Sequence, residues 1–139
     1  MREVDVCLIT ETVARLCVEA ACDLPEALCA RIEQCAAEEK SPVGQGIFED
    51  MKANYTLARE KRLPICQDTG MAVVFLRLGQ DVHLTGGDLT AAVNAGVAKG
   101  YTEGYLRKSV VSDPLRRVNT NDNTPAVLHV EIVPGDKIE

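Results

Sequence analysis

The sequence predicts an α+β fold, in which an N-terminal helical layer of about three helices precedes a mixed β-sheet with a further helix. Two observations support this prediction. Apolar residues recur every three to four positions up to about residue 61, and from residue 71 short β-rich runs take their place. The chain has 139 residues, the size of one domain. We therefore expect residues 1–139 to form a single domain.

The three N-terminal helices are predicted by apolar periodicity and by their start signals. Residues 3–21 carry apolar side chains every four positions, as on one face of a helix. Asp23 has the place of an N-cap for the second helix. The dipeptide Ser41-Pro42 then begins a third helix that extends to about Lys61. Because the connections between these segments are short, the three helices are expected to form one layer.

The strands are predicted by β-rich runs in the second half of the chain. Residues 71–78 are almost entirely apolar, which is typical of a strand buried on both faces. Residues 82–85 form a shorter candidate. Residues 126–133 alternate between apolar and polar side chains, as in a half-buried strand. Residues 137–139 resemble the start of another strand, so we expect the sequence to be a fragment of a longer chain.

A fourth helix and a long polar loop separate these strands. Asp88 is the expected N-cap of a helix over residues 89–104. Gly96 and Gly100 cost helix stability, which suggests that they allow close packing against a neighbour. Residues 105–125 are polar and irregular. A loop of this length inside a compact domain is usually functional or disordered.

Composition and cysteine spacing restrict the class of protein. The net charge of −6 argues against a nucleic-acid partner but allows a small anionic substrate. No run approaches about 18 apolar residues, and the charged start lacks the apolar region of a signal peptide. None of the six cysteines has C-x-x-C spacing, and the first five lie in helical segments. We interpret these five cysteines as small apolar residues that fill space in the core, in a reducing compartment. We therefore expect a cytoplasmic protein with no membrane partner.

The loop at residues 63–70 carries the greatest concentration of reactive groups. Between Pro64 and Gly70 it presents a thiol, an amide, a carboxylate and a hydroxyl on successive residues. Cys66 is either a buried core residue, a nucleophile or a metal ligand. Asp68 is either a general base or a residue that caps its own loop. Spacing alone leaves these alternatives open.

The other polar candidates favour structural roles when each is taken by itself. Arg107 could bind a carboxylate through a bidentate fork, although an isolated arginine is usually a solvated surface residue. His83 and His129 occupy polar positions on predicted strands. The asparagine-rich segment 119–124 either lines a site or forms ordinary turns.

Taken together, four stretches resemble the N-terminal part of the α-type region of class I iron–sulfur fumarases and L-tartrate dehydratases. The stretches follow one another in the family's order: Pro64–Gly70, Leu106–Leu115, Asn119–Ala126 and Val133–Asp136. Asn121 stands where this family is expected to have glycine. Because asparagine tolerates the left-handed conformation better than most residues, the loop can keep its shape.

The resemblance implies roles for four residues. Cys66 is implied to be one of three thiolate ligands of a four-iron four-sulfur cluster, and the other two ligands are absent from this chain. The open iron of such a cluster acts as a Lewis acid on the substrate. Gln67 and Asp68 are implied to contact the substrate, with Asp68 as the catalytic acid or base. Arg107 is implied to pair with a substrate carboxylate.

The resemblance also implies a function for the complete enzyme. It is expected to be an oligomeric hydro-lyase that reversibly hydrates fumarate to malate, a step of the tricarboxylic acid cycle, and a β-type subunit or domain closes the site. The alternative activities within the same class are dehydration of L-tartrate and hydration of methylated fumarates. Residues 1–139 are expected to be the truncated N-terminal portion of the α region and to be inactive alone. The alternative to an enzymatic function is that of a non-catalytic module that docks a partner subunit.

Overall fold

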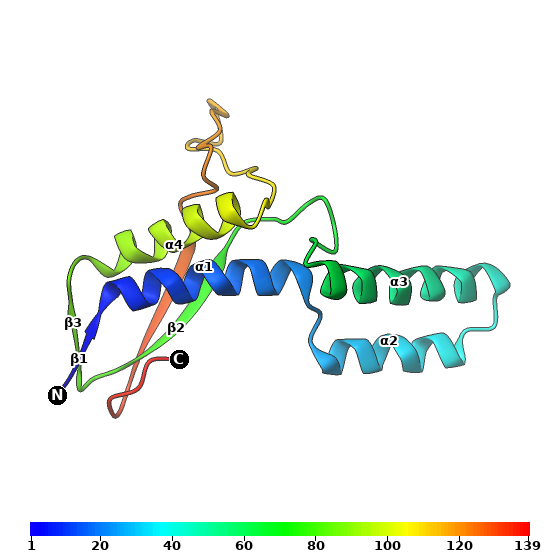
Figure 1. Ribbon diagram of the computed structural model, residues 1–139, viewed down its shortest axis with the longest axis horizontal. Helices are drawn as coiled ribbons and strands as arrows, with labels where there is room; N and C mark the ends of the chain where they lie inside the picture. The colour runs from blue at the N-terminus through cyan, green and yellow to red at the C-terminus, as the bar shows by residue number, and fades with distance from the viewer. The chain divides into compact units, whose positions relative to one another are not determined.

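A computed structural model describes residues 1–139, which form two compact units (Figure 1). The α/β unit comprises Met1–Val18 and Asp68–Glu139, and the helical unit comprises Glu19–Gln67. No helix is long and apolar enough to cross a membrane. The elements follow one another in the order β1 (Arg2–Asp5), α1 (Val6–Cys22), α2 (Glu26–Glu38), α3 (Pro42–Lys61), β2 (Val73–Gly79), β3 (Val82–Thr85), α4 (Leu89–Glu103) and β4 (Val127–Val133).

The α/β unit contains two parallel sheets of two strands each, so the predicted single mixed sheet is wrong. β1, which was expected to be the start of the first helix, pairs with β3. β2 pairs with β4 in a register that sets Phe75 opposite His129. Parallel partners need a long crossover, and β3 with α4 supply it between β2 and β4. On the other edge of β2, Ile138 forms an antiparallel bridge to Leu78.

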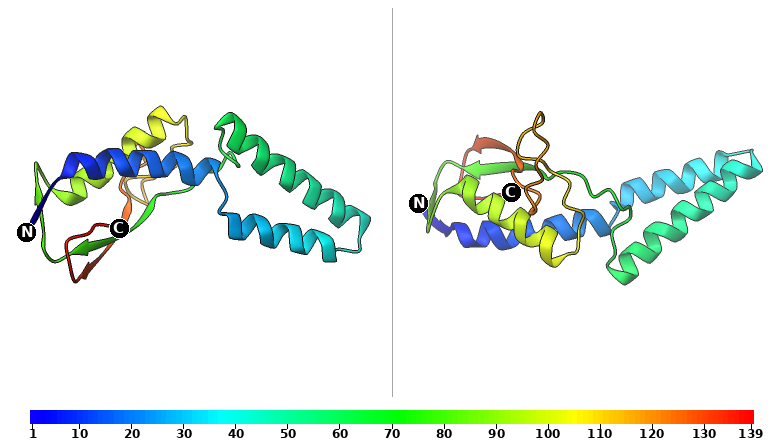
Figure 2. Two further views of the ribbon diagram at one scale, coloured as in Figure 1. Left: turned by 60° about the horizontal axis from the view of Figure 1, so that its bottom comes forward. Right: turned by 90° about the horizontal axis from the view of Figure 1, so that it is seen from above.

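Helices α1 and α4 lie side by side and approach closely at the two predicted glycines (Figures 1 and 2). A Cβ atom added to Gly96 would lie 2.6 Å from the carbonyl oxygen of Thr10. One added to Gly100 would lie 2.6 Å from that of Ala14. The packing reason predicted for these glycines is therefore confirmed. The most deeply buried apolar side chains of the unit lie on the same helix: Val93 and Val97.

The prediction that β2 is buried on both faces is wrong. Leu76 is 8% exposed, but Phe75 on the opposite face is 74% exposed. The Phe75 ring stacks on that of His129, with centroids 4.9 Å apart and planes inclined by 12°. A groove lined mainly by apolar residues, Leu8 and Leu16 among them, lies between α1 and β2. Only one face of β2 is therefore covered by protein.

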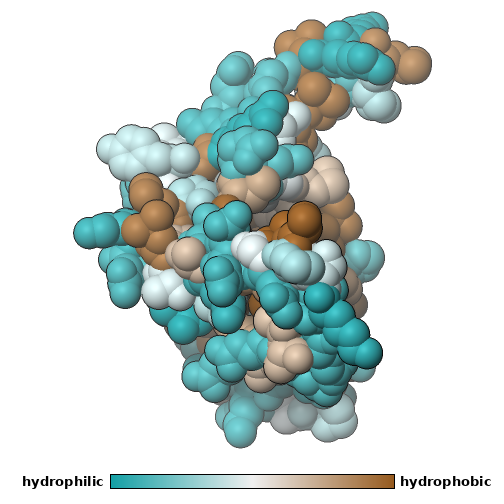
Figure 3. Space-filling view, turned by 90° about the vertical axis from the view of Figure 1, so that its right-hand side faces the viewer, coloured by the Kyte–Doolittle hydropathy of each residue, from teal (hydrophilic) through white to brown (hydrophobic).

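The helical unit is an α2–α3 hairpin (Figure 1). Ser41 caps α3 as predicted, because its side chain accepts a hydrogen bond from the Gly44 N–H at 3.5 Å and Pro42 is the first helical residue. The predicted three-helix layer is wrong, since α1 up to Val18 belongs to the α/β unit. Hydrophobic atoms appear among hydrophilic ones at the end of the hairpin (Figure 3). Several large apolar side chains of α2 and α3 are exposed: Leu28, Val43, Ile47, Met51 and Leu57.

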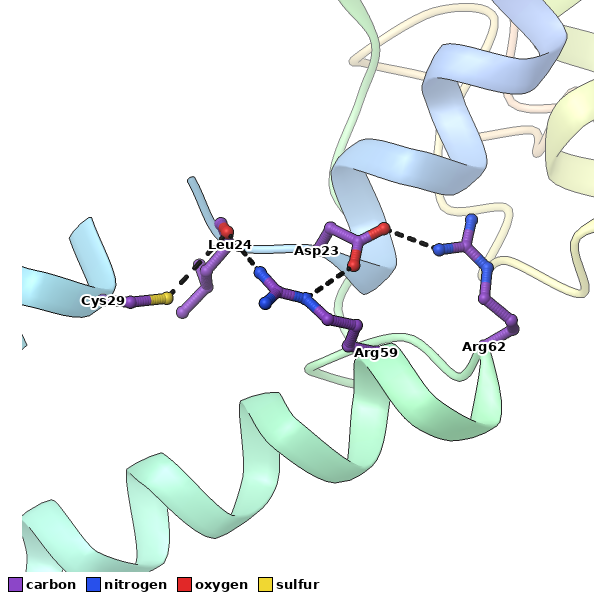
Figure 4. A network of polar contacts seen from close by, with 5 residues as sticks. All are labelled: Asp23, Leu24, Cys29, Arg59 and Arg62. Carbon is purple, nitrogen blue, oxygen red and sulfur yellow. Dashed lines mark hydrogen bonds and ion pairs between the residues drawn. The ribbon is translucent and has the colours of Figure 1, made fainter. Parts of the chain in front are cut away.

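Asp23 does not cap α2, contrary to the prediction. The helix begins at Glu26 without a side-chain cap. The Asp23 carboxylate instead accepts from Arg59 Nε at 3.1 Å and from Arg62 Nη1 at 2.6 Å (Figure 4). Arg59 also donates to the carbonyl oxygen of Leu24 at 3.0 Å. These bonds connect both ends of the hairpin, and the Arg62 guanidinium is the main reason that the pKa of Asp23 is lowered.

Candidate functional site

The predicted site residues are divided between the two units. Cys66 and Gln67 end the helical unit, whereas Asp68 and Arg107 belong to the α/β unit. The stretch that holds the first three is a loop without helix or strand, as predicted, and all four residues are exposed.

In the helical unit, hydrogen bonds to Ile65 fix the backbone just before Cys66. The Ile65 N–H donates to the carbonyl oxygen of Ala21 at 2.9 Å, and the Asn54 side-chain amide donates to the Ile65 carbonyl oxygen at 2.9 Å. The Cys66 thiol lies 3.3 Å from Oε1 of Gln67. The thiol thus lies on the surface, and the residue before it, Ile65, is hydrogen-bonded at both its backbone N–H and its carbonyl oxygen.

In the α/β unit, Asp68 begins a tight turn. Its Oδ1 accepts from the N–H of Gly70 at 3.2 Å, and Gly70 has a φ of 66°. This is the loop-capping role that the sequence left open for Asp68. Thr69 Oγ1 donates to the carbonyl oxygen of Arg107 at 3.1 Å. The turn and the Arg107 segment are therefore joined, although 38 residues separate them in sequence.

Asn123 holds the same two segments from the inside. Its side chain is completely buried, and it is the one buried polar residue of the chain. Its Oδ1 accepts from the backbone N–H groups of Ser109 at 2.8 Å and Val110 at 3.0 Å. Its Nδ2 donates to the carbonyl oxygen of Gly70 at 3.0 Å. Sequence reasoning did not separate Asn123 from its neighbours, because these contacts depend on the fold and have no local signature.

Tyr101 of α4 also forms hydrogen bonds with the turn. Its hydroxyl lies 3.1 Å from the carbonyl oxygen of Thr69 and 3.2 Å from that of Gly70, and it donates to both. The side chain is 4% exposed, and burial raises the pKa of Tyr101. The hydroxyl therefore keeps its proton, and with it the hydrogen bond to the turn, at neutral pH.

The rest of the asparagine-rich segment makes mostly local turns. Asn119 Nδ2 donates to the carbonyl oxygen of Lys108 at 2.9 Å. Asp122 Oδ1 accepts from the backbone and side chain of Thr124, and these hydrogen bonds lower the pKa of Asp122. Asn121 has a φ of 66°. It therefore adopts the left-handed conformation that was expected for an asparagine replacing glycine.

Five of the six cysteines lie on α1 and α2, as predicted. Burial raises the pKa of the Cys17 and Cys22 thiols, and the neighbouring Asp5 raises that of Cys7. Raised pKa values disfavour the thiolate that binds metals. Cys66 is the one cysteine on a loop. No three His, Cys, Asp or Glu side chains are gathered as a metal ion requires.

The two histidines lie on strands. His83 is on β3 opposite Glu3, and His129 is on β4 against Phe75. The structure gives both the strand positions that the sequence predicted.

Comparison with known proteins gives one family. The family model described as Fumarate hydratase (Fumerase) matches residues 10–139. A Methanocaldococcus jannaschii protein assigned as L(+)-tartrate dehydratase subunit alpha is 33% identical over 116 residues, which is 83% of this chain and 40% of the relative. The aerobic class I fumarate hydratase of Salmonella typhimurium is 41% identical over 86 residues, which is 60% of this chain and 15% of the relative. The chain thus spans less than half the length of these relatives.

Proposed function

Since the chain belongs to the family of class I fumarate hydratases and L-tartrate dehydratase alpha subunits, we propose that it supplies part of the active site of a fumarate hydratase. The observation that carries this proposal is the hydrogen bond from Thr69 to the Arg107 carbonyl oxygen, which joins the segments of Asp68 and Arg107. An exposed carboxylate and an exposed guanidinium on joined loops are suited to a dicarboxylate substrate, because one can move a proton while the other binds a carboxylate.

In the proposed reaction, water adds across the double bond of fumarate to give malate. The Arg107 guanidinium binds one substrate carboxylate and fixes the orientation of the double bond. The Asp68 carboxyl group donates a proton to one carbon of the double bond, and the hydroxyl group is added to the other carbon. In the dehydration direction, the Asp68 carboxylate accepts that proton, and the hydroxyl group departs as hydroxide, which takes up a proton to give water. The Gln67 amide contacts the polar substrate from the adjacent position.

The family also implies a four-iron four-sulfur cluster, and this chain fits one of its ligands. Cys66 is exposed on a loop and would hold one iron, whereas the other cysteines lie on helices and are not gathered. When bound, the cluster supplies a Lewis-acidic iron for the substrate hydroxyl. Because two further thiolates are needed, we propose that residues 1–139 alone form neither a stable cluster nor an active enzyme. Iron and sulfide reconstitution followed by absorbance spectroscopy tests this, and a stoichiometric cluster would contradict it.

The active assembly is proposed to contain more polypeptide than these residues, in an oligomer. The chain spans 40% of the M. jannaschii relative, whose name describes it as an alpha subunit. We therefore propose that residues 1–139 act as the N-terminal portion of an α region, together with the remaining α part and a β-type subunit or domain.

In that assembly, Asp68→Asn should lower the turnover number by about 100-fold to 10,000-fold, because it removes the proposed acid or base. The cluster absorbance should stay unchanged. Asp113→Asn is the matched control: Asp113 also caps a loop, accepting from the Leu115 N–H at 2.9 Å and the Arg116 N–H at 2.7 Å. The control should retain activity. Equal loss of cluster and activity in Asp68→Asn would mean that Asp68 is structural.

L-tartrate dehydration is the second candidate activity. The alignment with the tartrate dehydratase subunit covers 83% of the chain, against 60% for the fumarate hydratase. Comparing kcat/KM for malate, L-tartrate and methylated malates on one preparation separates these substrates. If the chain binds its partner but no assembly has activity on any of them, the non-catalytic docking module becomes the better explanation.

A further inference from the structure

We infer that Asn123 is a positioning residue, which sets the place of the Asp68 carboxylate relative to the Arg107 segment. The inference rests on the proposed function, because it gives Asn123 a catalytic consequence through those two residues. All of the hydrogen bonds on which it depends lie within the α/β unit. Asn123 itself is buried and is not proposed to touch the substrate.

Gly70 is the residue through which Asn123 acts on Asp68. The carbonyl oxygen of Gly70 accepts from Asn123 Nδ2 at 3.0 Å. The N–H of the same residue donates to Asp68 Oδ1 at 3.2 Å. The φ of Gly70, 66°, lies in the left-handed region. Because one residue carries both hydrogen bonds, the bond from Asn123 restrains the residue whose N–H donates to the Asp68 carboxylate.

The other end of the Asn123 amide fixes the segment that follows Arg107. Its Oδ1 accepts from two successive backbone N–H groups, those of Ser109 and Val110. These donors decide the orientation of the amide, since an NH₂ group facing two N–H groups would leave all of them unsatisfied. One rigid, fully buried side chain thus joins both segments of the proposed site. The Thr69 bond to Arg107 joins them a second time, nearer the surface.

Tyr101 provides a second and weaker restraint on the same carbonyl group. Its hydroxyl lies 3.2 Å from the Gly70 carbonyl oxygen, compared with 3.0 Å for Asn123 Nδ2. The same hydroxyl also hydrogen-bonds to the Thr69 carbonyl oxygen at 3.1 Å and to the Asn123 side chain. Loss of the hydroxyl should therefore loosen the turn without separating the turn from Ser109 and Val110.

The decisive variant is Asn123→Asp, which keeps the shape of the side chain and the acceptor for Ser109 and Val110 but removes the donor to Gly70. Asn121→Asp is the matched control, because Asn121 lies two residues away, has a φ of 66° against 65° for Asn123, and is exposed. Tyr101→Phe removes the second donor and keeps the buried ring.

Two measurements test the inference. In the isolated chain, Asn123→Asp should speed hydrogen exchange of the Gly70 amide at least tenfold, while amides in the middle of α4 keep their protection. In the active assembly, it should lower kcat by about 100-fold, since small displacements of a reacting group cost about that much. Tyr101→Phe should lower kcat about tenfold, and the double variant should lose less than the product of the two.

The inference is overturned if exchange rises equally in α4, because Asn123 then stabilises the unit as a whole. It is also overturned if Asn123→Asp and Asn121→Asp lower kcat equally. The proposed function fails separately, if Asp68→Asn keeps full turnover. In that case the exchange result still decides whether Asn123 fixes the turn.

Discussion

The two units of this chain differ in the kind of interaction that stabilises each of them internally. In the α/β unit, α4 approaches the backbone of α1 at Gly96 and Gly100, and the loops close over a fully buried Asn123. In the helical unit, few side chains are buried, and an exposed cluster of Asp23, Arg59 and Arg62 connects the ends of the hairpin. We therefore expect the stability of the first unit to depend on shape and that of the second to depend to a greater extent on charge.

This difference bears on how the proposed site residues are presented. Asp68 and Arg107 belong to the unit that is held by close packing and buried hydrogen bonds. Such contacts leave few alternative arrangements, which suits groups that must meet a substrate in one geometry. Cys66 belongs to the unit that is held by charged surface groups.

The largest expected effect on the stability of either unit comes from adding one methyl group to α4. Gly96→Ala should destabilise the α/β unit by about 2 kcal/mol, because the new Cβ would lie 2.6 Å from the Thr10 carbonyl oxygen and 2.8 Å from the Val13 Cβ. The clash outweighs the gain of about 1 kcal/mol that alanine brings to a helix. Hydrogen exchange of α4 amides against those of α3 measures the loss in the correct unit.

Gly46→Ala in α3 is the control for this comparison. Nothing lies within 4 Å of a Cβ added at Gly46. The same substitution should therefore stabilise the helical unit by roughly 0.5–1 kcal/mol through helix propensity alone. Opposite signs at the two glycines would confirm that shape decides one unit and not the other. Stabilisation at both would contradict the close approach of α1 and α4.

The sequence allowed the helices to be predicted better than the sheets, for a physical reason. The period of a helix and its N-cap are local, so Ser41 and Asp88 identified the starts of α3 and α4 correctly. Strand pairing joins residues far apart, and no local signal indicated that residues 2–5 pair with β3. Asp23 failed as a cap because it pairs with Arg59 and Arg62, 36 and 39 residues away.

The candidate site shows the same limit. The polar loop with Cys66 and Asp68 was recognisable because its residues are consecutive, and the resemblance to a family added Arg107. What joins Asp68 to Arg107 was not recognisable. Asn123 bonds to residues 13, 14 and 53 positions away, and it has the same side chain as its neighbours Asn119 and Asn121. Identifying it requires the fold.

The smaller expected effect is a pH dependence confined to the helical unit. Hydrogen bonds from Arg62 first, and from Arg59, lower the pKa of Asp23 below its ordinary value. The carboxylate therefore contributes stability that is present above the unfolded pKa of about 3.9, and this stability is lost as pH falls through the lower folded pKa. Between about pH 5 and pH 2, α3 amides should lose protection in the wild type more than in Asp23→Asn.

The carboxyl resonance of Asp23 reports this effect directly in an NMR titration. Arg62→Gln should move the midpoint upward more than Arg59→Gln does, because the Arg62 bond is the larger cause of the shift. Arg31→Gln is the control, since Arg31 bonds to Gln34 at 2.8 Å and makes no ion pair with Asp23. Equal midpoints in Arg62→Gln and Arg31→Gln would show that charge does not hold the hairpin ends together. The helical unit would then depend, like the α/β unit, on packing.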